Sequence, residues 1–201
     1  MPFEVKHLGL VNYESTCQSM QAYTQQRDEN TPDQIWFLEH PAVFTLGYAG
    51  DPSHILNPGS IPIVKTDRGG QVTYHGPGQL IVYTLIDLKR RKIGIKQWVK
   101  HLEQSTVSLL KEFNIPASTR CNAPGVYVND AKICSIGLRV RHGCTYHGLA
   151  LNVNMDLEPF SRINPCGMSN LAMTQLADFG VPLSVHEVSE RLMKYLREHL
   201  A

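Results

Sequence analysis

Short apolar runs that end at turn residues make up most of the chain. Residues 3–8 alternate between apolar and polar positions, which predicts an opening strand. Other runs are rich in branched and aromatic residues and are bounded by Gly, Pro, Asn or Asp, which is typical of strands. These strands are expected at 34–38, 43–47, 61–64, 80–86, 126–128, 132–141 and 145–153, with one more inside 68–80. Most of them follow one another in hairpin order, with turns at 39–41, 129–130 and 142–143.

Three stretches predict helices. Asn12 is a suitable N-cap for a helix at 13–28. Ser184 and Glu187 have the spacing of a capping box and open a last helix. Between them, residues 95–114 are periodic, with one apolar face made of Ile95, Val99, Leu102, Thr106, Leu109, Leu110 and Phe113. Helices combined with hairpin strands predict an α+β fold, in which helices pack against a mixed, largely antiparallel sheet.

Composition narrows the class of protein. A chain of 201 residues with 42% hydrophobic residues suits a single domain, which we place at 1–201. The net charge of +1 gives no electrostatic reason to expect nucleic acid or a membrane surface as partner. The chain starts without a signal peptide and contains five cysteines, an odd number, so we expect free thiols in a cytoplasmic protein. No exposed apolar stripe argues against a monomer.

The segment at 68–80, Arg-Gly-Gly-Gln-Val-Thr-Tyr-His-Gly-Pro-Gly-Gln-Leu, is the most unusual part of the chain, and we call it the Gly-rich segment. Its glycines either form hairpin turns or let the backbone approach a ligand closely. The basic run that follows at 89–92 has two interpretations as well. It is either a solvated turn or a docking patch for an acidic protein.

Lys132 is an unusual residue for a strand whose two faces are otherwise uncharged. Strict alternation would place Lys132 on the same face as Cys134, Ile136 and Leu138. A partly buried ammonium loses hydration, which lowers its pKa and suits it to acid–base chemistry. The alternative is a lysine near a strand end whose ammonium reaches water.

Cys166 lies between Pro165 and Gly167, outside any periodic run, so we expect an accessible thiol on a rigid turn. A neighbouring cation would increase its thiolate fraction, and Lys132 is the candidate. The rival pair is Lys132 with Cys134, which are close in sequence, although Cys134 lies in an apolar strand. The sequence leaves this choice open.

A metal site is not expected. Cys144 and His147 have a C-x-x-H spacing, with His75 and His142 as further candidate ligands, but no second pair of ligands exists. We expect His75 and His147 to form hydrogen bonds within the pocket instead. A phosphate-binding G-x-x-x-x-G-K-[ST] motif is absent from the sequence as well.

Five motifs occur in an order that resembles the bacterial lipoyl(octanoyl) transferase family. They lie at 68–79, 125–128, 132–137, 147–154 and 164–167, and the resemblance covers most of the chain. It implies the fold of the lipoate and biotin protein ligases. It also implies transfer of an octanoyl group from octanoyl-acyl carrier protein to a lysine of a lipoyl domain, the first step of protein lipoylation.

The resemblance assigns roles to residues of this chain. Cys166 matches the family's acyl-thioester nucleophile, and Lys132 the lysine that lowers its pKa. The matching substrate-binding residues are Arg68, Gly69, Gly70, Gln71, Val72, Thr73, Tyr74, His75, Ser135, Ile136, Gly137, Gly148, Leu149 and Ala150. We add His147, Gly76 and Gly167 as supporting residues, with the backbone N–H groups near Cys166 and Gly167 as candidate oxyanion donors.

The implied reaction needs no cofactor and no metal, because the acyl group arrives as a thioester on the phosphopantetheine of acyl carrier protein. The implied acceptors are the apo lipoyl domains of 2-oxoacid dehydrogenase complexes and the glycine cleavage H protein. Two alternatives stay open. One is an ATP-dependent lipoate or biotin protein ligase of the same fold, and the other is a non-catalytic protein that binds carrier or lipoyl domains.

Overall fold

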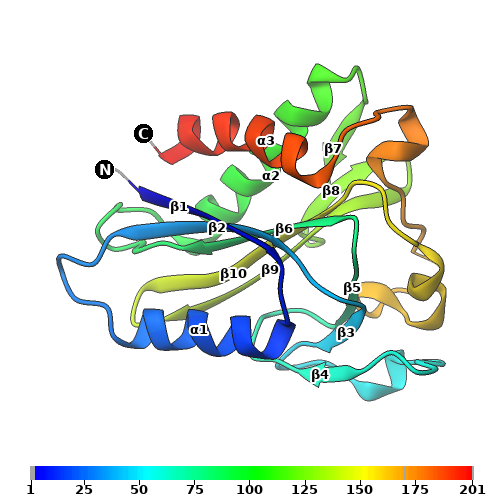
Figure 1. The fold of residues 1–201 in the computed structure, drawn as a ribbon, viewed down its shortest axis with the longest axis horizontal. Helices are drawn as coiled ribbons and strands as arrows, with labels where there is room; N and C mark the ends of the chain where they lie inside the picture. Colours follow the sequence, from blue (N-terminus) through cyan, green and yellow to red (C-terminus); the bar gives the residue numbers. More distant parts are fainter. Residues whose placement is uncertain (1–2, 170, 201) are drawn as a thin grey trace.

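The computed structural model describes residues 3–169 and 171–200, and its described strands form two sheets (Figure 1). The larger, seven-stranded sheet has the order β1-β2-β6-β10-β9-β8-β7. Its strands are β1 (Phe3–Leu10), β2 (Asp33–Glu39), β6 (Gln79–Leu85), β10 (Cys144–Asn152), β9 (Ala131–Arg141), β8 (Gly125–Val128) and β7 (Ala117–Thr119). The smaller sheet has the order β4-β3-β5, with β4 at Ile63–Lys65, β3 at Val43–Leu46 and β5 at Val72–His75.

The pairing confirms the mixed, largely antiparallel arrangement. Only the pairs β1–β2 and β3–β4 are parallel among the described strands. Hairpin order fails at residues 39–41, because β2 already has β1 and β6 on its two sides, and β3 pairs in the smaller sheet instead. The edge strand β7 was not expected from the sequence.

Three helices cover the two faces of the larger sheet. Within the described residues, α2 (Ile95–Glu112) and α3 (Val185–Leu200) pack on one face, and α1 (Tyr13–Gln25) lies on the other (Figure 1). The main core lies between the sheet and the first two helices, and a second core lies under α1. A third core joins the smaller sheet to the short helical turn Glu158–Arg162.

The predicted caps form. The Asn12 side chain accepts a hydrogen bond from Ser15 N at 3.2 Å, and Ser184 and Glu187 exchange hydrogen bonds at the start of α3. Helix α1 ends before the predicted position, because the Asp28 carboxylate accepts hydrogen bonds from the next backbone N–H groups and forms a turn.

The buried face of α2 is rotated slightly from the predicted one. Ile95, which the pattern placed on the apolar face, is 36% exposed, whereas Trp98 is fully buried. The Trp98 indole N–H donates to Thr84 Oγ1 at 3.2 Å, so its polar atom is satisfied inside the core. The indole therefore replaces Ile95 as the contact between the first turns of α2 and the sheet.

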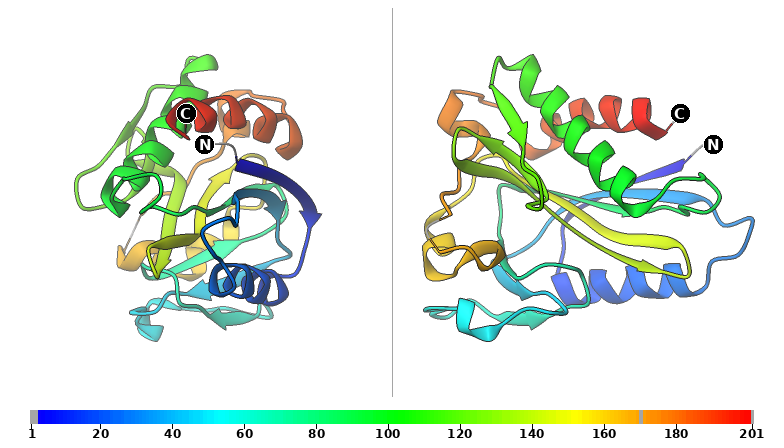
Figure 2. Two further views of the ribbon diagram at one scale, coloured as in Figure 1. Left: turned by 90° about the vertical axis from the view of Figure 1, so that its left-hand side faces the viewer. Right: turned by 180° about the vertical axis from the view of Figure 1, so that it is seen from behind.

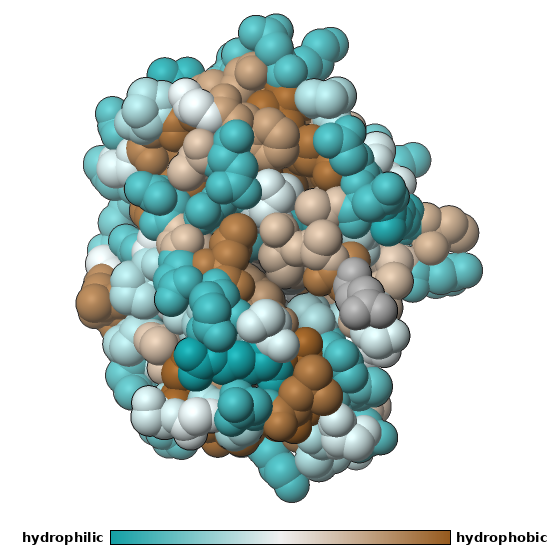
Figure 3. Space-filling view, turned by 90° about the vertical axis from the view of Figure 1, so that its right-hand side faces the viewer, coloured by the Kyte–Doolittle hydropathy of each residue, from teal (hydrophilic) through white to brown (hydrophobic). Residues whose placement is uncertain are grey.

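The two ends of the described chain lie close together, at one side of the sheet (Figures 1 and 2). The segment from about 155 to 180 lies at the opposite end of the molecule (Figure 1). Seen face-on, that end mixes hydrophobic and hydrophilic residues without one continuous apolar surface (Figure 3). No helix among the described residues is long and apolar enough to cross a membrane.

Candidate active site

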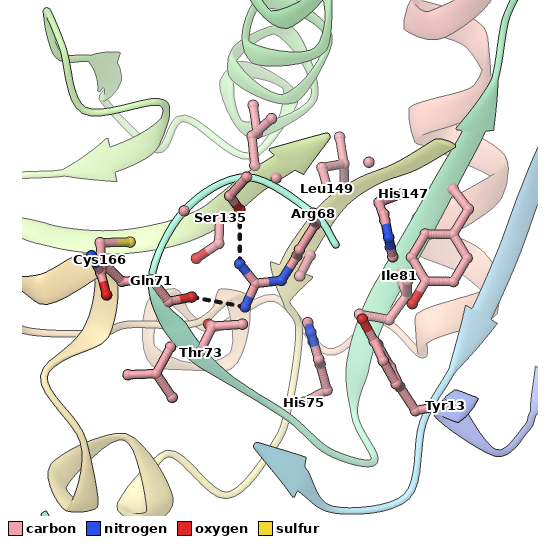
Figure 4. A pocket seen from close by; sticks show the side chains of 18 residues that line it. Tyr13, Arg68, Gln71, Thr73, His75, Ile81, Ser135, His147, Leu149 and Cys166 are labelled. Carbon is pink, nitrogen blue, oxygen red and sulfur yellow. Dashed lines mark hydrogen bonds between the residues drawn. The ribbon is translucent and has the colours of Figure 1, made fainter. Parts of the chain in front are cut away.

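A cavity of about 60 Å³ lies between the Gly-rich segment and strands β9 and β10 (Figure 4). Its lining consists of Tyr13, Arg68, Gly69, Gly70, Gln71, Val72, Thr73, His75, Ile81, Tyr83, Ser135, Ile136, Gly137, His147, Gly148, Leu149, Ala150 and Cys166. Figure 4 shows Cys166 at one side of this cavity and His147 with Tyr13 at the other, with Arg68 between them. We call it the acyl pocket because of the role argued below.

All the predicted substrate-binding residues except Tyr74 line this pocket, whereas the supporting residues Gly76 and Gly167 do not. The Tyr74 ring packs in the third core against Phe44 and Phe160, because alternation along β5 turns it away from Thr73 and His75. Gly76 follows β5 and lies against the Tyr74 ring, where an added Cβ would clash with the phenol.

Tyr13, Ile81 and Tyr83 line the pocket although the sequence did not single them out. Ile81 and Tyr83 share one face of β6, and Tyr83 is the one residue of the 80–83 run with a polar group. This hydroxyl in an apolar strand could have identified Tyr83 as a pocket residue from the sequence. Tyr13 had no comparable feature, because its position over the pocket depends on how α1 packs against the sheet.

Close backbone packing explains why two positions in this pocket wall are glycine. A Cβ at Gly137 would lie 3.2 Å from both Arg68 Cδ and Gly69 O. Gly70 has φ of +89°, a conformation that side chains rarely adopt. The Gly-rich segment therefore lies directly against β9, as Gly69 N donating to Leu138 O at 3.0 Å shows.

Arg68 holds this segment in place from inside. Its guanidinium donates to Thr45 O, Thr45 Oγ1 and Gln71 O at 2.7–2.9 Å, and to Gly69 O at 2.9 Å. Burial lowers the pKa of Arg68, but an arginine stays charged at neutral pH. Arg68 therefore organises the wall of the pocket and leaves a positive charge beside it.

Folding brings Lys132 to Cys166 rather than to Cys134. Lys132 Nζ donates to Cys166 Sγ at 3.2 Å and to Pro124 O at 3.1 Å, and it lies 5.2 Å from the centre of the Tyr127 ring. Lys132 is 2% exposed, whereas Cys166 is exposed. The pair thus joins a buried cation to an accessible thiol.

The strand alternation used to place Lys132 was wrong, because β9 contains a bulge. Val126 pairs with Cys134 but Tyr127 pairs with Lys132, so Ile133 is an extra residue in the ladder. Ile133 and Cys134 both pack in the main core, and Lys132 lies on the other side of the strand. Burial raises the pKa of Cys134 to about 12, which makes that thiol inert at neutral pH.

Cys166 occupies a short helical turn, Pro165–Gly167, with left-handed backbone angles of φ 58° and ψ 19°. Gly167 N donates to Asn164 O and Met168 N to Pro165 O, so this turn is closed on itself. The N–H of Gly167 is therefore engaged and is not a free oxyanion donor in this conformation.

The pKa of Lys132 is raised, whereas it was expected from the sequence to be lowered. Burial by itself lowers the pKa of Lys132, but the Cys166 thiolate and Tyr127 outweigh this effect and raise the pKa above its ordinary value. Contact with Cys166 therefore favours the ammonium form of Lys132, whereas burial opposes it.

Histidines at the far side of the pocket are held neutral by burial. Burial lowers the pKa of His75 to about 3 and that of His40 to about 4. His147 Nε2 lies 3.0 Å from Asp67 Oδ1, and burial lowers its pKa despite that carboxylate. As expected, His75 and His147 form hydrogen bonds within the pocket wall, His75 through Nδ1 to Gln79 Oε1 at 2.8 Å.

Asp67, Cys17 and His147 place one ligand atom each within 4.8 Å of the other two. However, Asp67 already accepts hydrogen bonds from Tyr146, His147 and Gln21. Burial raises the pKa of the Cys17 thiol to about 11. Both observations disfavour a metal at this group.

Comparison with known proteins places the chain in a family. Residues 12–197 match the model of the lipoyl protein ligase A/B catalytic domain. The chain is 56% identical over 188 residues to an octanoyltransferase of Shewanella amazonensis, covering 94% of this chain and 87% of the relative. It is 53% identical over 201 residues to an octanoyltransferase of Chromobacterium violaceum, covering 100% and 97%.

Solved structures of low identity share the fold. A lipoate-protein ligase A bound with ATP superposes with a TM-score of 0.83 at 18% identity, covering all of this chain and 86% of that one. The biotin protein ligase of Aquifex aeolicus gives a TM-score of 0.60 at 15% identity, covering 99% and 70%. The predicted ligase-like fold is thereby confirmed, and the chain belongs to the lipoyl protein ligase A/B catalytic domain family.

Proposed function

We propose that this protein is an octanoyltransferase, which moves an octanoyl group to a lysine of a lipoyl domain through a thioester on Cys166. The high identity to octanoyltransferases supports the reaction. The single observation that carries the mechanism is the contact of 3.2 Å between the buried Lys132 ammonium and the exposed Cys166 thiol, beside the acyl pocket. The donor that fits is octanoyl-acyl carrier protein, whose thioester is already activated.

In the first step, the Cys166 thiolate attacks the carbonyl carbon of the octanoyl thioester. A new C–S bond forms to Cys166, and the bond to the phosphopantetheine sulfur breaks. The leaving thiolate takes a proton from the Lys132 ammonium, which leaves neutral Lys132 beside an uncharged thioester. Burial at this position favours that neutral form.

In the second step, the acceptor lysine attacks the Cys166 thioester. With an ordinary pKa of about 10.4, the acceptor ammonium first loses one proton to water, and the resulting amine attacks. Neutral Lys132 takes the second proton, which the nitrogen loses as the amide forms, and Cys166 leaves as the thiolate that the new ammonium stabilises. The pair returns to its starting state, so one lysine serves both steps.

The acyl pocket is suited to hold the hydrocarbon chain. Val72, Ile81, Ile136, Leu149 and Ala150 give it apolar walls. Neither ATP nor a metal enters this scheme, because the thioester supplies the driving force for the amide. Since Cys166 must stay reduced, we expect the reaction to take place in the cytoplasm. The acceptors that we expect are the lipoyl domains of 2-oxoacid dehydrogenases and the glycine cleavage H protein.

The test is to incubate the protein with octanoyl-acyl carrier protein without ATP. We expect an increase in mass equal to one octanoyl group, located by peptide mass on Cys166. Cys166→Ala should abolish this adduct, whereas the matched control Cys121→Ala, at the other exposed cysteine, should keep it. An adduct that persists in Cys166→Ala would refute the mechanism. A strict need for ATP would favour the ligase alternative.

A further inference from the structure

A second group of polar side chains lies where β1 passes the start of α3, and it shares no residue with the acyl pocket. His7 comes from β1, and His186 and Glu190 are one turn apart on α3. One ligand atom of each lies within 4.8 Å of the other two, and all three residues are exposed. We propose that His7, His186 and Glu190 form a binding site for a divalent transition-metal ion such as Zn²⁺.

The distances suit a tetrahedral ion. His7 Nε2 and Glu190 Oε1 are 3.3 Å apart. Two ligand atoms at metal–ligand bonds of about 2.0–2.1 Å are roughly 3.3 Å apart in a tetrahedral site. This pair therefore already has the spacing of two ligands of one ion. His186 is the third ligand, and its ring meets the His7 ring edge-on with centroids 5.6 Å apart. Its exposed side chain can rotate to complete the site.

Both sides of the site are anchored. The His7 ring stacks on Phe37, with centroids 5.2 Å apart and an interplanar angle of 17°, which fixes the orientation of the imidazole. On the other side, the hydrogen bonds between Ser184 and Glu187 define the first turn of α3. Orientation of ligands before binding reduces the entropy lost on binding.

The donor set selects the class of metal. Two imidazoles and one carboxylate suit Zn²⁺, Ni²⁺ or Cu²⁺, whereas Mg²⁺ and Ca²⁺ prefer oxygen ligands. Three protein ligands leave a fourth position open. His7 and His186 also line a cleft of about 130 Å³, walled by Phe37, Leu38 and Leu80. The fourth position is therefore accessible to water or to a small ligand in the cleft.

Metal binding would join the edge strand β1 to helix α3. Among the described strands, β1 is an edge strand that pairs only with β2. An ion shared by His7 and the two residues of α3 would tie this edge to the helix. Since the unfolded chain lacks the site, the bound ion would stabilise the fold in proportion to its free concentration.

The experiment titrates the metal-free protein with Zn²⁺ by calorimetry and with Co²⁺ by absorption spectroscopy. His186→Ala and Glu190→Gln remove ligands, and His142→Ala is the matched control, because His142 is an exposed histidine outside the group. We expect one tight equivalent in the wild type and the control, and binding at least about tenfold weaker in the two ligand variants. Zn²⁺ should raise the Tm of the control by about 2–4 °C or more but not that of His186→Ala.

The cysteines are the competing ligands, and the cobalt spectrum separates them from the proposed site. Nitrogen and oxygen ligands give visible d–d bands without thiolate-to-cobalt charge transfer. Equal binding by wild type and His186→Ala would overturn the proposal. The proposal would also be overturned if the spectrum showed a thiolate-to-cobalt band that disappears in Cys166→Ala and no second Co²⁺ ion were bound.

Discussion

Lys132 is only 2% exposed, and its contacts explain why this buried side chain stays charged. Burial acts against this charge, and the largest cause that raises the pKa of Lys132 is its interaction with Cys166. The carbonyl of Pro124 and the face of the Tyr127 ring supply the other favourable contacts. The charge of Lys132 therefore depends on the chemical state of the nucleophile beside it.

Substitution of Lys132 should separate the two steps of the reaction. Lys132→Arg keeps a cation beside Cys166, but a guanidinium cannot lose its proton near neutral pH. We expect acylation of Cys166 to persist, because the leaving phosphopantetheine thiolate can take its proton from water instead, while transfer to the lipoyl domain falls by about 10²–10⁴-fold. Single-turnover measurements with intact mass detection resolve the two rates. Near-normal transfer in Lys132→Arg would show that charge alone suffices.

At the scale of secondary structure elements, Asp33 of β2 joins the end of α1 to the turn at 87–91, at one end of the larger sheet. Its side chain is fully buried and contacts Arg27, Arg90 and Arg91 at 2.6–2.8 Å, and it also accepts from Asp87 N at 2.9 Å. Burial by itself raises the pKa of Asp33, but these hydrogen bonds and charges outweigh it and hold the pKa below its usual range.

This cluster corrects the interpretation of the basic run at 89–92. Neither a solvated turn nor a docking patch describes its two arginines, because Arg90 and Arg91 bind Asp33 and are 20% and 7% exposed at the side chain. Only Lys89 and Lys92 of that run are exposed. Any contribution of the run to binding an acidic carrier protein therefore falls to the two lysines.

Asp33→Asn should destabilise the fold strongly. The substitution leaves three guanidinium groups around an uncharged side chain, and breaking such a buried pair costs about 3–5 kcal/mol. Urea unfolding followed by circular dichroism measures the change. Asp130→Asn is the control, because the ion pair of Asp130 with Arg120 lies at the surface and should contribute about 1 kcal/mol or less. Equal effects of the two substitutions would contradict the role given to Asp33.

At the scale of the whole molecule, the sheet order brings together residues that are distant in sequence around one pocket. β6 and β10 are neighbours at the centre of the larger sheet, and the Gly-rich segment crosses to β9. Behind this pocket, His40 Nδ1 donates to Val11 O and His40 Nε2 forms a hydrogen bond with Tyr83 Oη, both at 2.7 Å. His75 and His147 are buried as well.

These neutral histidines make global stability depend on pH. Their pKa values in the folded state lie below the ordinary 6.5, at about 4 for His40 and about 3 for His75, because of burial. Below pH 6.5 the unfolded chain therefore binds more protons than the folded one, and the free energy of unfolding falls as pH falls. The expected slope is about 1.4 kcal/mol per pH unit for each histidine.

Urea unfolding at pH 7, 6 and 5 tests this dependence. Carboxylates cause a separate decrease in the free energy of unfolding at lower pH. One example is Asp67, whose pKa is held at about 2 by hydrogen bonds from His147 and Tyr146, against the effect of burial. That loss begins only below about pH 4, the ordinary pKa of an aspartate. A free energy of unfolding that stays constant between pH 7 and 5 would contradict the prediction.

Local sequence signals were sufficient for most elements and for the reactive thiol. Pro165 and Gly167 marked the turn of Cys166, and Asn12 marked the start of α1, because both effects act within a few residues. The bulge at Ile133 has no such signal, so alternation gave the wrong face for Lys132. Choosing Cys166 over Cys134 as its partner required the fold, since the deciding contact joins residues 34 positions apart.

The backbone of Lys132 is tied to the chain that follows Cys166. Lys132 N donates to Ala172 O at 2.8 Å, and Thr174 N donates to Lys132 O at 3.0 Å. The ammonium and the thiol are thus linked twice, once through side chains and once through the main chain. A displacement of this loop that keeps these bonds moves both groups as one body. The main-chain link thus supports the short distance between the Lys132 ammonium and the Cys166 thiol.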